Sequence, residues 1–239
     1  MSGGMITEGL IQDRLCVVRE RVADALRRSG RGPDEARILV AGKYYAPEQI
    51  AALADAGVEL LGENRAEHLL EKQAMFGEVF EWHFIGHLQR RKVKQVVGRV
   101  TLVHSVDSLR LVEELAKRAP EEGVGALIQV NVSGEESKYG IVESEVESLL
   151  WAAAETRKVR VRGFMTLAPL VERAEDVRYV FAKLREIRDR LRASWGAHFD
   201  LSELSMGMSS DYPVAVEEGA TIIRIGRACL TEERKEARS

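Results

Sequence analysis

The chain has 239 residues, of which 45% are hydrophobic and 31% are charged, a composition typical of a globular protein with a sizeable core. Its 35 basic and 38 acidic side chains give a formal net charge of −3, which argues against a protein that coats nucleic acid. The longest stretch without a charged residue, Gly123 to Gly134, is too short to cross a membrane, and the first residues lack the pattern of an export signal.

The first predicted element is an amphipathic helix over residues 7–29, followed by a segment of glycine and proline. Strands and helices then alternate along the chain. The predicted strands are short and apolar, and they cover residues 37–43, 58–63, 81–87, 101–106, 125–132, 159–166, 201–207 and 221–226. The helical patterns that separate them cover residues 47–57, 65–76, 89–98, 108–118, 143–157, 172–194 and 211–219.

Eight strand and helix units in a chain of this length predict an α/β fold, a (β/α)8 TIM barrel with an extra N-terminal helix. A doubly wound open sheet is the alternative, but eight strands of similar length favour closure. No linker or change of composition marks a second domain, so we expect one domain over residues 1–239 with an ordered core of about 7–231. Cys16 and Cys229 are far apart and have no metal-type spacing, which favours a reducing compartment, and we expect a cytoplasmic protein.

A lysine stands at the end of the first predicted strand, where barrels of this kind collect their functional groups. Lys43 follows Ile38-Leu39-Val40-Ala41, so we expect its ammonium to be partly desolvated. Desolvation makes an amine a better nucleophile toward aldehydes, and Lys43 is therefore a candidate for a Schiff base. From its position alone, a lysine whose stem packs while its head reaches water is the commoner outcome.

A second group of candidates lies in residues 205–211 and at the end of the last strand. Small residues fill the loop 205–211, which opens a helix, and such loops bind phosphate in barrels, although a plain helix cap explains the same residues. Arg224 lies in an apolar run and requires a partner, either a ligand nitrogen or a barrel carboxylate. An amine that faces a phosphate site indicates pyridoxal phosphate, and an arginine on its ring nitrogen would leave the ring a weak electron sink.

Motifs along most of the chain resemble the pyridoxal phosphate homeostasis protein family, the YggS/PROSC-like proteins. The match runs in order from about residue 10 to residue 230. The motifs that carry it are Val40-Ala41-Gly42-Lys43, Gly62-Glu63-Asn64, Trp82-His83-Phe84-Ile85-Gly86, residues 131–140, Arg162-Gly163-Phe164-Met165, Leu204-Ser205-Met206-Gly207-Met208-Ser209 and Arg224-Ile225-Gly226.

The resemblance implies a barrel like the N-terminal domain of bacterial alanine racemase, with pyridoxal 5'-phosphate held as a reversible Schiff base on Lys43. It implies phosphate contacts around Ser205, Ser209, Gly226 and Arg227, and Arg224 at the ring nitrogen. The remaining predicted cofactor-binding residues are Asn64, His83, Lys138 and Met165. The implied protein is a cytoplasmic monomer that serves vitamin B6 homeostasis by binding and releasing the cofactor, with pyridoxal phosphate-dependent apoenzymes as candidate recipients.

The chain departs from the family at two positions near the site. Tyr45 stands where many members carry a second lysine, which argues against transfer of the cofactor between two lysines at this position. Lys138 is left as a second basic candidate. Arg227 replaces a small hydroxyl residue that is common in the family.

Two enzymatic functions are alternatives to a carrier without catalytic activity. A racemase-like enzyme acting on amino acids needs an acid or base beside the lysine, for which His83, His87 and Tyr139 are the candidates. A Schiff-base aldolase acting on a sugar phosphate would need no cofactor. His83 and His87 are expected on one face of a strand, but no third ligand has a helpful spacing, so we expect no metal site.

Overall fold

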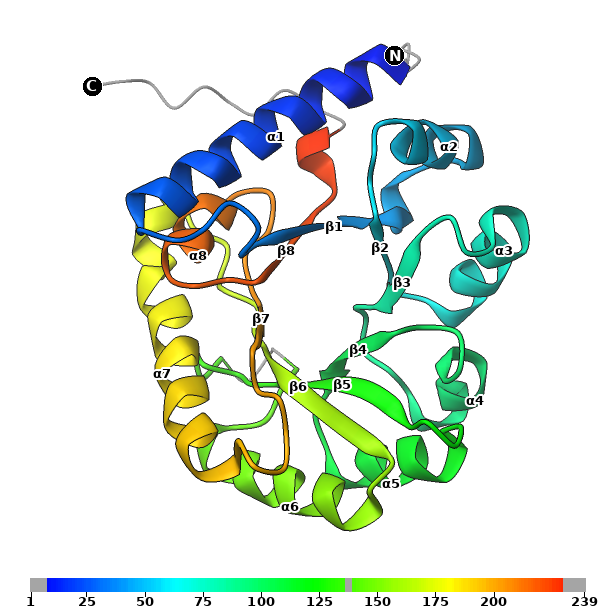
Figure 1. The fold of residues 1–239 in the computed structure, drawn as a ribbon, viewed down its shortest axis with the longest axis vertical. Coiled ribbons are helices and arrows are strands. Elements are labelled where there is room, and N and C mark those ends of the chain that lie inside the picture. The colour runs from blue at the N-terminus through cyan, green and yellow to red at the C-terminus, as the bar shows by residue number, and fades with distance from the viewer. Residues whose placement is uncertain (1–7, 136–138, 230–239) are drawn as a thin grey trace.

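A computed structural model describes residues 8–135 and 139–229 of the chain. Within these residues, eight parallel strands form a closed barrel in sequence order, and helices surround it (Figure 1). The barrel closes where β1 pairs with both β2 and β8, so that Leu39 lies beside Leu60 on one side and Arg224 on the other. The predicted α/β barrel is therefore confirmed.

The strands are short, as the sequence predicted, and they are β1 Arg37–Ala41, β2 Leu60–Glu63, β3 Glu81–Phe84, β4 Leu102–Val106, β5 Val124–Gln129, β6 Val159–Met165, β7 Glu203–Ser205 and β8 Ile222–Ile225. The helices are α1 Glu8–Arg28, α2 Pro47–Asp55, α3 Ala66–Phe76, α4 Val93–Val96, α5 Leu109–Arg118, α6 Val146–Thr156, α7 Arg178–Trp195 and α8 Tyr212–Glu217. Short 3-10 turns lie at η1 Gly42–Tyr44, η2 Arg90–Lys92, η3 Glu143–Glu145, η4 Ala174–Val177 and η5 Arg227–Cys229.

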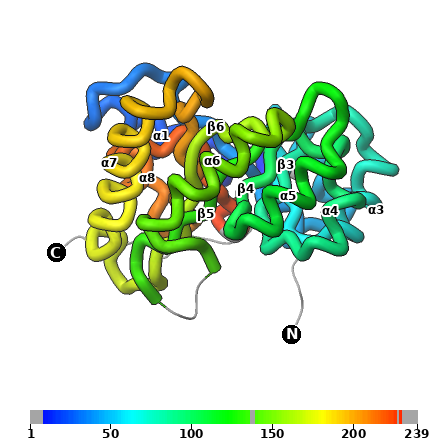
Figure 2. Tube along the Cα trace, turned by 90° about the horizontal axis from the view of Figure 1, so that it is seen from below, coloured from blue at the N-terminus to red at the C-terminus, as the bar shows by residue number. Residues whose placement is uncertain are grey.

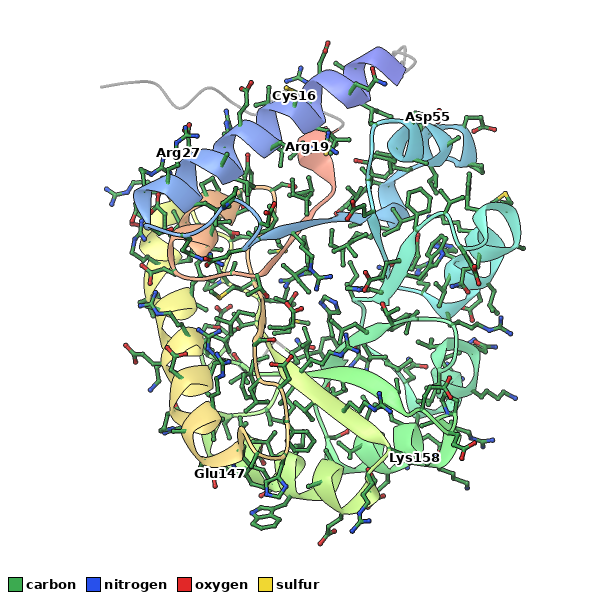
Figure 3. All side chains as sticks on the ribbon, viewed as in Figure 1. Cys16, Arg19, Arg27, Asp55, Glu147 and Lys158 are labelled. Atoms are coloured by element: carbon green, nitrogen blue, oxygen red, sulfur yellow. The ribbon has the colours of Figure 1, made fainter. Side chains whose placement is uncertain are left out.

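Two apolar clusters stabilise the barrel. The larger one lies between the strands and the surrounding helices, which wrap the outside in both views (Figures 1 and 2). A smaller cluster packs within the barrel, where side chains occupy the space between the strands (Figure 3). Its buried members come from six different strands, and they are Leu39, Leu60, Leu102, Leu127, Met165 and Ile222. Helices and strands thus bury apolar surface on both sides of the sheet, which is the dominant favourable term in folding.

The N-terminal helix α1 is the extra element that precedes the first strand. It packs against α2, α8 and η5. Arg19, labelled in Figure 3, donates from one nitrogen to the carbonyl oxygens of Ala56 and Gly57, both at 2.9 Å. Both carbonyls lie just after α2, where the last carbonyl groups of a helix have no hydrogen-bond donor within the helix. In the part of the chain that the structure describes, no helix is both long and apolar enough to span a bilayer.

Element boundaries differ from the sequence predictions mainly at the carboxyl ends of strands. The strand predicted for 37–43 ends at Ala41, and the strand predicted for 81–87 ends at Phe84. The helices predicted from residues 89 and 143 begin instead with the 3-10 turns η2 and η3. Such turns are common at helix ends. Their repeat of about three residues is close to that of an α-helix, so the apolar pattern of the sequence does not distinguish the two.

Candidate functional site

The structure places Lys43 in a turn that leaves the first strand, and not in the strand itself. The chain turns sharply at η1, where the amide of Tyr45 donates to the carbonyl of Gly42 at 3.0 Å. Lys43 is exposed, and its Nζ lies 4.8 Å from the centroid of the Tyr44 ring. The expected desolvation of this lysine is therefore wrong, because the strand ends two residues earlier and the turn carries the amine into solvent.

A buried ion pair supports that turn. Glu63 at the end of β2 is fully buried, and its Oε1 accepts from Lys72 Nζ of α3 at 2.5 Å. The same Nζ donates to the carbonyl oxygen of Gly42 at 2.7 Å. A side chain at Gly42 would collide with this pair, since a Cβ at that position would lie 2.3 Å from Glu63 Oε1. The pair therefore fixes the backbone that presents Lys43.

Arg224 in β8 points into the barrel and is buried. Its NH1 donates to Ser205 Oγ at 2.6 Å, and its NH2 donates to the carbonyl oxygen of Thr166 at 2.8 Å. Among the described residues no carboxylate forms an ion pair with it, although the charge of Asp211 acts on it from nearby. Burial lowers the pKa of Arg224 to about 10, and the group remains a cation at neutral pH. The carboxylate partner that the sequence left open is thus not observed.

Ser209 joins the loop after β7 to the end of β8. The amide N–H groups of Gly226 and Ala228 both point at its Oγ, at 3.3 and 3.2 Å. These two bonds hold the Ser209 hydroxyl in place at the end of β8. Asp211 closes the same loop by accepting the Met208 amide at 2.6 Å, and burial raises the pKa of this carboxyl group.

Two neighbouring tyrosines pack against Gly226. A Cβ at position 226 would lie 2.5 Å from ring carbons of Tyr44, so only glycine allows this close approach. Tyr45 is buried, and its hydroxyl donates to the carbonyl oxygen of Gly226 at 2.9 Å. Burial, with a smaller contribution from Cys229, raises the pKa of Tyr45, which stays neutral. The residue that replaces a family lysine therefore ties the end of β8 to the turn of Lys43.

The other predicted site residues do not form one cluster. Ser205 is fully buried and contacts Arg224 and His104, so the structure separates it from Ser209 and Gly226. His83 is also fully buried, within hydrogen-bonding distance of His104. Met165 belongs to the apolar cluster inside the barrel, and the buried Oδ1 of Asn64 has no hydrogen-bond partner in the described structure. Lys138 lies outside the described residues, and the structure does not describe the side chain of Arg227.

His87 does not share a strand with His83, because β3 ends at Phe84. Its ring stacks on the exposed Tyr139 with centroids 4.2 Å apart, and its Nδ1 lies 3.3 Å from Asp107 Oδ2. Desolvation raises the pKa of Asp107, more than the neighbouring His87 lowers it. The expected common face of the two histidines is therefore wrong, because the chain leaves the sheet between them.

Sequence reasoning did not identify His104 as a site residue. It is fully buried in β4, and its two ring nitrogens lie 2.9 Å from His83 Nδ1 and from Ser205 Oγ. A polar residue inside the apolar run 102–106 was the available signal, since such residues require a buried partner. The identity of that partner depends on the closure of the barrel.

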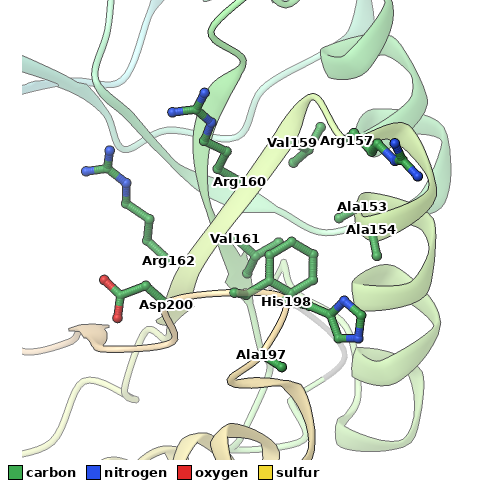
Figure 4. A pocket seen from close by; sticks show the side chains of 11 residues that line it. Ala153, Ala154, Arg157, Val159, Arg160, Val161, Arg162, Ala197, His198 and Asp200 are labelled. Atoms are coloured by element: carbon green, nitrogen blue, oxygen red, sulfur yellow. The ribbon is translucent and has the colours of Figure 1, made fainter.

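A cavity of about 610 Å³ opens elsewhere, at the amino-terminal end of β6 (Figure 4). Arg160, Arg162, His198 and Asp200 are among the residues that line it. Lys43, Ser209 and Gly226 lie instead just beyond the carboxyl ends of their strands. Because barrels of this kind collect their chemistry at the carboxyl ends of the strands, we assign the site to that mouth.

Comparisons with known proteins show which family the chain resembles. The family model of the alanine racemase N-terminal domain matches residues 46–232. The chain is 44% identical over 226 residues to the pyridoxal phosphate homeostasis protein of Aquifex aeolicus, a match that covers 93% of this chain and 98% of that protein. It is 35% identical to the protein of the same name from Escherichia coli K12, with 91% and 94% covered.

A solved structure extends the comparison to three dimensions. PipY of Synechococcus elongatus, solved with pyridoxal phosphate bound, is 30% identical and has a TM-score of 0.79. That match covers 92% of this chain and 100% of PipY. The resemblance predicted from the motifs is therefore confirmed. The chain belongs to the family of pyridoxal phosphate homeostasis proteins, which is built on the fold of the alanine racemase N-terminal domain.

Proposed function

We propose that this chain binds pyridoxal phosphate at the carboxyl-terminal mouth of its barrel and serves vitamin B6 homeostasis by holding and releasing it. One observation carries the proposal: an exposed amine, a hydroxyl on two amides and a buried guanidinium lie on three neighbouring strands or the turns that follow them, and among the described residues the guanidinium has no carboxylate ion-pair partner. These groups belong to Lys43, Ser209 and Arg224. Relatives named for this role, and PipY with the cofactor bound, support the proposal.

Ser209 fits a phosphate group. Its hydroxyl oxygen accepts the amides of Gly226 and Ala228, so both of its lone pairs are used and its proton is left to donate to an anionic oxygen. Ser209 is only partly buried, and a ligand in the mouth can reach it. We propose that the hydroxyl of Ser209 donates to a phosphate bound beside Gly226, with Arg227 as a further contact.

Arg224 fits the ring nitrogen. A guanidinium has five N–H donors and no acceptor, and two of its nitrogens donate to Ser205 and Thr166. A further N–H of Arg224 can donate to the ring nitrogen of the cofactor only if that nitrogen carries no proton. We propose that Arg224 keeps the ring nitrogen unprotonated, which makes the ring a poor electron sink and favours a carrier over an enzyme. Asn64, whose Oδ1 has no hydrogen-bond partner in the described structure, and Lys138 remain proposed contacts.

When bound, pyridoxal phosphate supplies an aldehyde with which an amine condenses reversibly, with loss of water. Lys43 presents its amine from a turn held by the buried pair of Glu63 and Lys72. His83, one of the acid-base candidates, is sealed inside the barrel and cannot reach a substrate in the mouth. We propose that the protein acts as a cytoplasmic monomer and that pyridoxal phosphate-dependent apoenzymes receive the cofactor from it.

Absorption spectroscopy and peptide mapping test the proposal. The purified chain is titrated with pyridoxal phosphate, reduced with borohydride and digested, and we expect a cofactor-dependent visible band and a label on Lys43. Lys43→Ala should lose the label and keep its thermal unfolding transition, whereas Lys117→Ala, which changes an exposed lysine of α5, should behave as the wild type. A label that persists in Lys43→Ala, or no band with excess cofactor, would contradict the assignment. A racemase-like enzyme would in addition turn over an amino acid.

A further inference from the structure

A line of hydrogen bonds runs through the barrel from one mouth to the other. It begins at Glu81 in the first position of β3, whose Oε1 lies 2.9 Å from His83 Nε2. His83 Nδ1 lies 2.9 Å from His104 Nε2, and His104 Nδ1 lies 2.9 Å from Ser205 Oγ. Ser205 then accepts from Arg224 NH1 at 2.6 Å. All the links between Glu81 and Arg224 are fully buried, and we call these five side chains the axial chain.

When each ring carries one proton, the carboxylate end of the axial chain determines the direction of every bond. The hydrogen bond from His83 lowers the pKa of Glu81 to about 2, so its carboxylate only accepts, while Arg224 only donates. With one proton on each ring, His83 must donate from Nε2 to Glu81, and its Nδ1 must accept from His104 Nε2. His104 Nδ1 then accepts from the Ser205 hydroxyl. Both histidines are thereby fixed as Nε2–H tautomers, and every donor points toward Glu81.

Burial and the surrounding charges favour a neutral ring at His104. Burial, together with the nearby His83, Arg224 and Arg37, lowers the pKa of His104 well below its usual value. Arg37 in β1 also faces Glu81 at 3.7 Å, and Asp211 acts on Arg224 from the loop after β7. A second proton on His104 would place another cation near Arg224 and Arg37. It would also reverse the donor direction and point His104 Nδ1–H at Ser205.

We propose that His83, His104 and Ser205 are positioning residues that connect Arg224 to the carboxylate of Glu81 at the opposite mouth and hold the guanidinium in its cofactor-facing orientation. Arg224 is a buried cation without a direct carboxylate partner among the described residues. Aligned hydrogen bonds polarise one another in a low dielectric, so the axial chain brings the influence of a distant negative charge to Arg224. The inference deepens the proposed function, since it takes Arg224 as the residue that faces the cofactor ring.

The tautomers can be measured without any cofactor. Nitrogen-15 NMR of the histidine side chains in the cofactor-free protein reports which ring nitrogen carries the proton. We expect the proton of both rings, His83 and His104, on Nε2, and we expect His104 to stay neutral across the neutral pH range. A proton on Nδ1 of either ring would overturn the inference whatever the protein binds.

The coupling to the cofactor is tested from the far mouth with a matched pair of variants. Glu81→Gln removes the charge that ends the axial chain. The glutamine side chain can donate as well as accept, so the donor direction of the hydrogen bonds in the axial chain is no longer fixed. Glu203→Gln removes the same charge from the same mouth. Glu203 contacts Arg37 at 2.7 Å, as well as Thr221, but does not contact the axial chain.

Equilibrium dialysis of pyridoxal phosphate against both variants gives the decisive comparison. We expect Glu81→Gln to raise the dissociation constant at least about fivefold, the lower end of site-to-site coupling, and to move the bound absorption band. Glu203→Gln should stay within about twofold, as expected for a partly exposed charge pair. Equal effects of the two substitutions, or no effect of Glu81→Gln, would refute the coupling. Failure of the wild type to bind cofactor would refute the proposed function instead and leave the tautomer result standing.

Discussion

Replacing Lys72 with methionine should destabilise the barrel, because the carboxylate of Glu63 would remain buried without its cation. The side chain of Glu63 is fully inaccessible, and that of Lys72 is 10% exposed. Glu63 Oε2 already lacks a hydrogen-bond partner among the described residues, so Oε1 carries the whole interaction with Lys72. The substitution also removes the donor to the Gly42 carbonyl, next to Lys43.

The expected loss follows from the burial of the pair. Removing one partner of a buried ion pair typically costs about 3–5 kcal/mol, because the remaining charge is left in a low dielectric. For a chain of this size, each kcal/mol lowers the melting temperature by about 2–4 °C, so a decrease of about 6–20 °C is expected. Lys72→Met together with Glu63→Gln removes both charges and should recover most of the loss, while the binding of pyridoxal phosphate stays weakened by the loosened turn.

Urea unfolding followed by tryptophan fluorescence measures the free energy of unfolding of each variant. The matched control is Lys92→Met, which removes the same side chain from a pair with Glu67 whose members are 31% and 51% exposed. Exposed pairs contribute little, so the control should lose less than about 1 kcal/mol. A loss as small as this in Lys72→Met would refute the argument, since it would mean that the Glu63 side chain reaches water in the folded protein.

Two further predictions concern acid stability and thiol reactivity. The pKa of Glu81 falls from its usual 4.5 to about 2 in the folded protein, chiefly through its hydrogen bond with His83. Its stabilising contribution is therefore complete above pH 4.5 and is lost as the pH falls toward 2. The stability difference between the wild type and Glu81→Gln should shrink across that window, and a difference that grows on acidification would contradict the assignment. Burial also raises the pKa of Cys229 to about 11, whereas Cys16 is exposed. Iodoacetamide at mildly alkaline pH should therefore label Cys16 alone in the folded protein, and equal labelling of Cys229, detected by mass spectrometry, would show that η5 opens.

Local patterns were sufficient to predict the architecture. Apolar strands such as 125–132 and amphipathic helices such as 7–29 show their periodicity in a window of a few residues, and their alternation indicates a barrel without any knowledge of contacts. The same local information identified Lys43, Ser209 and Arg224, because a lysine or arginine in an apolar run and a loop of small residues before a helix are unusual by themselves. Strand ends were less predictable, since an apolar residue continues a pattern whether or not it pairs in the sheet.

Only the tertiary structure decided which side chains are partners. Glu81, His104 and Ser205 lie on β3, β4 and β7, and closure of the barrel is what points them at a common axis. Lys43 was expected to be desolvated by its apolar neighbours in sequence, but burial depends on where the sheet ends, and the turn after Ala41 exposes it. The sequence by itself determined the fold and the chemical types at the mouth. The burial and partners of those groups were decided by strand register and closure, which bring together residues that are distant along the chain.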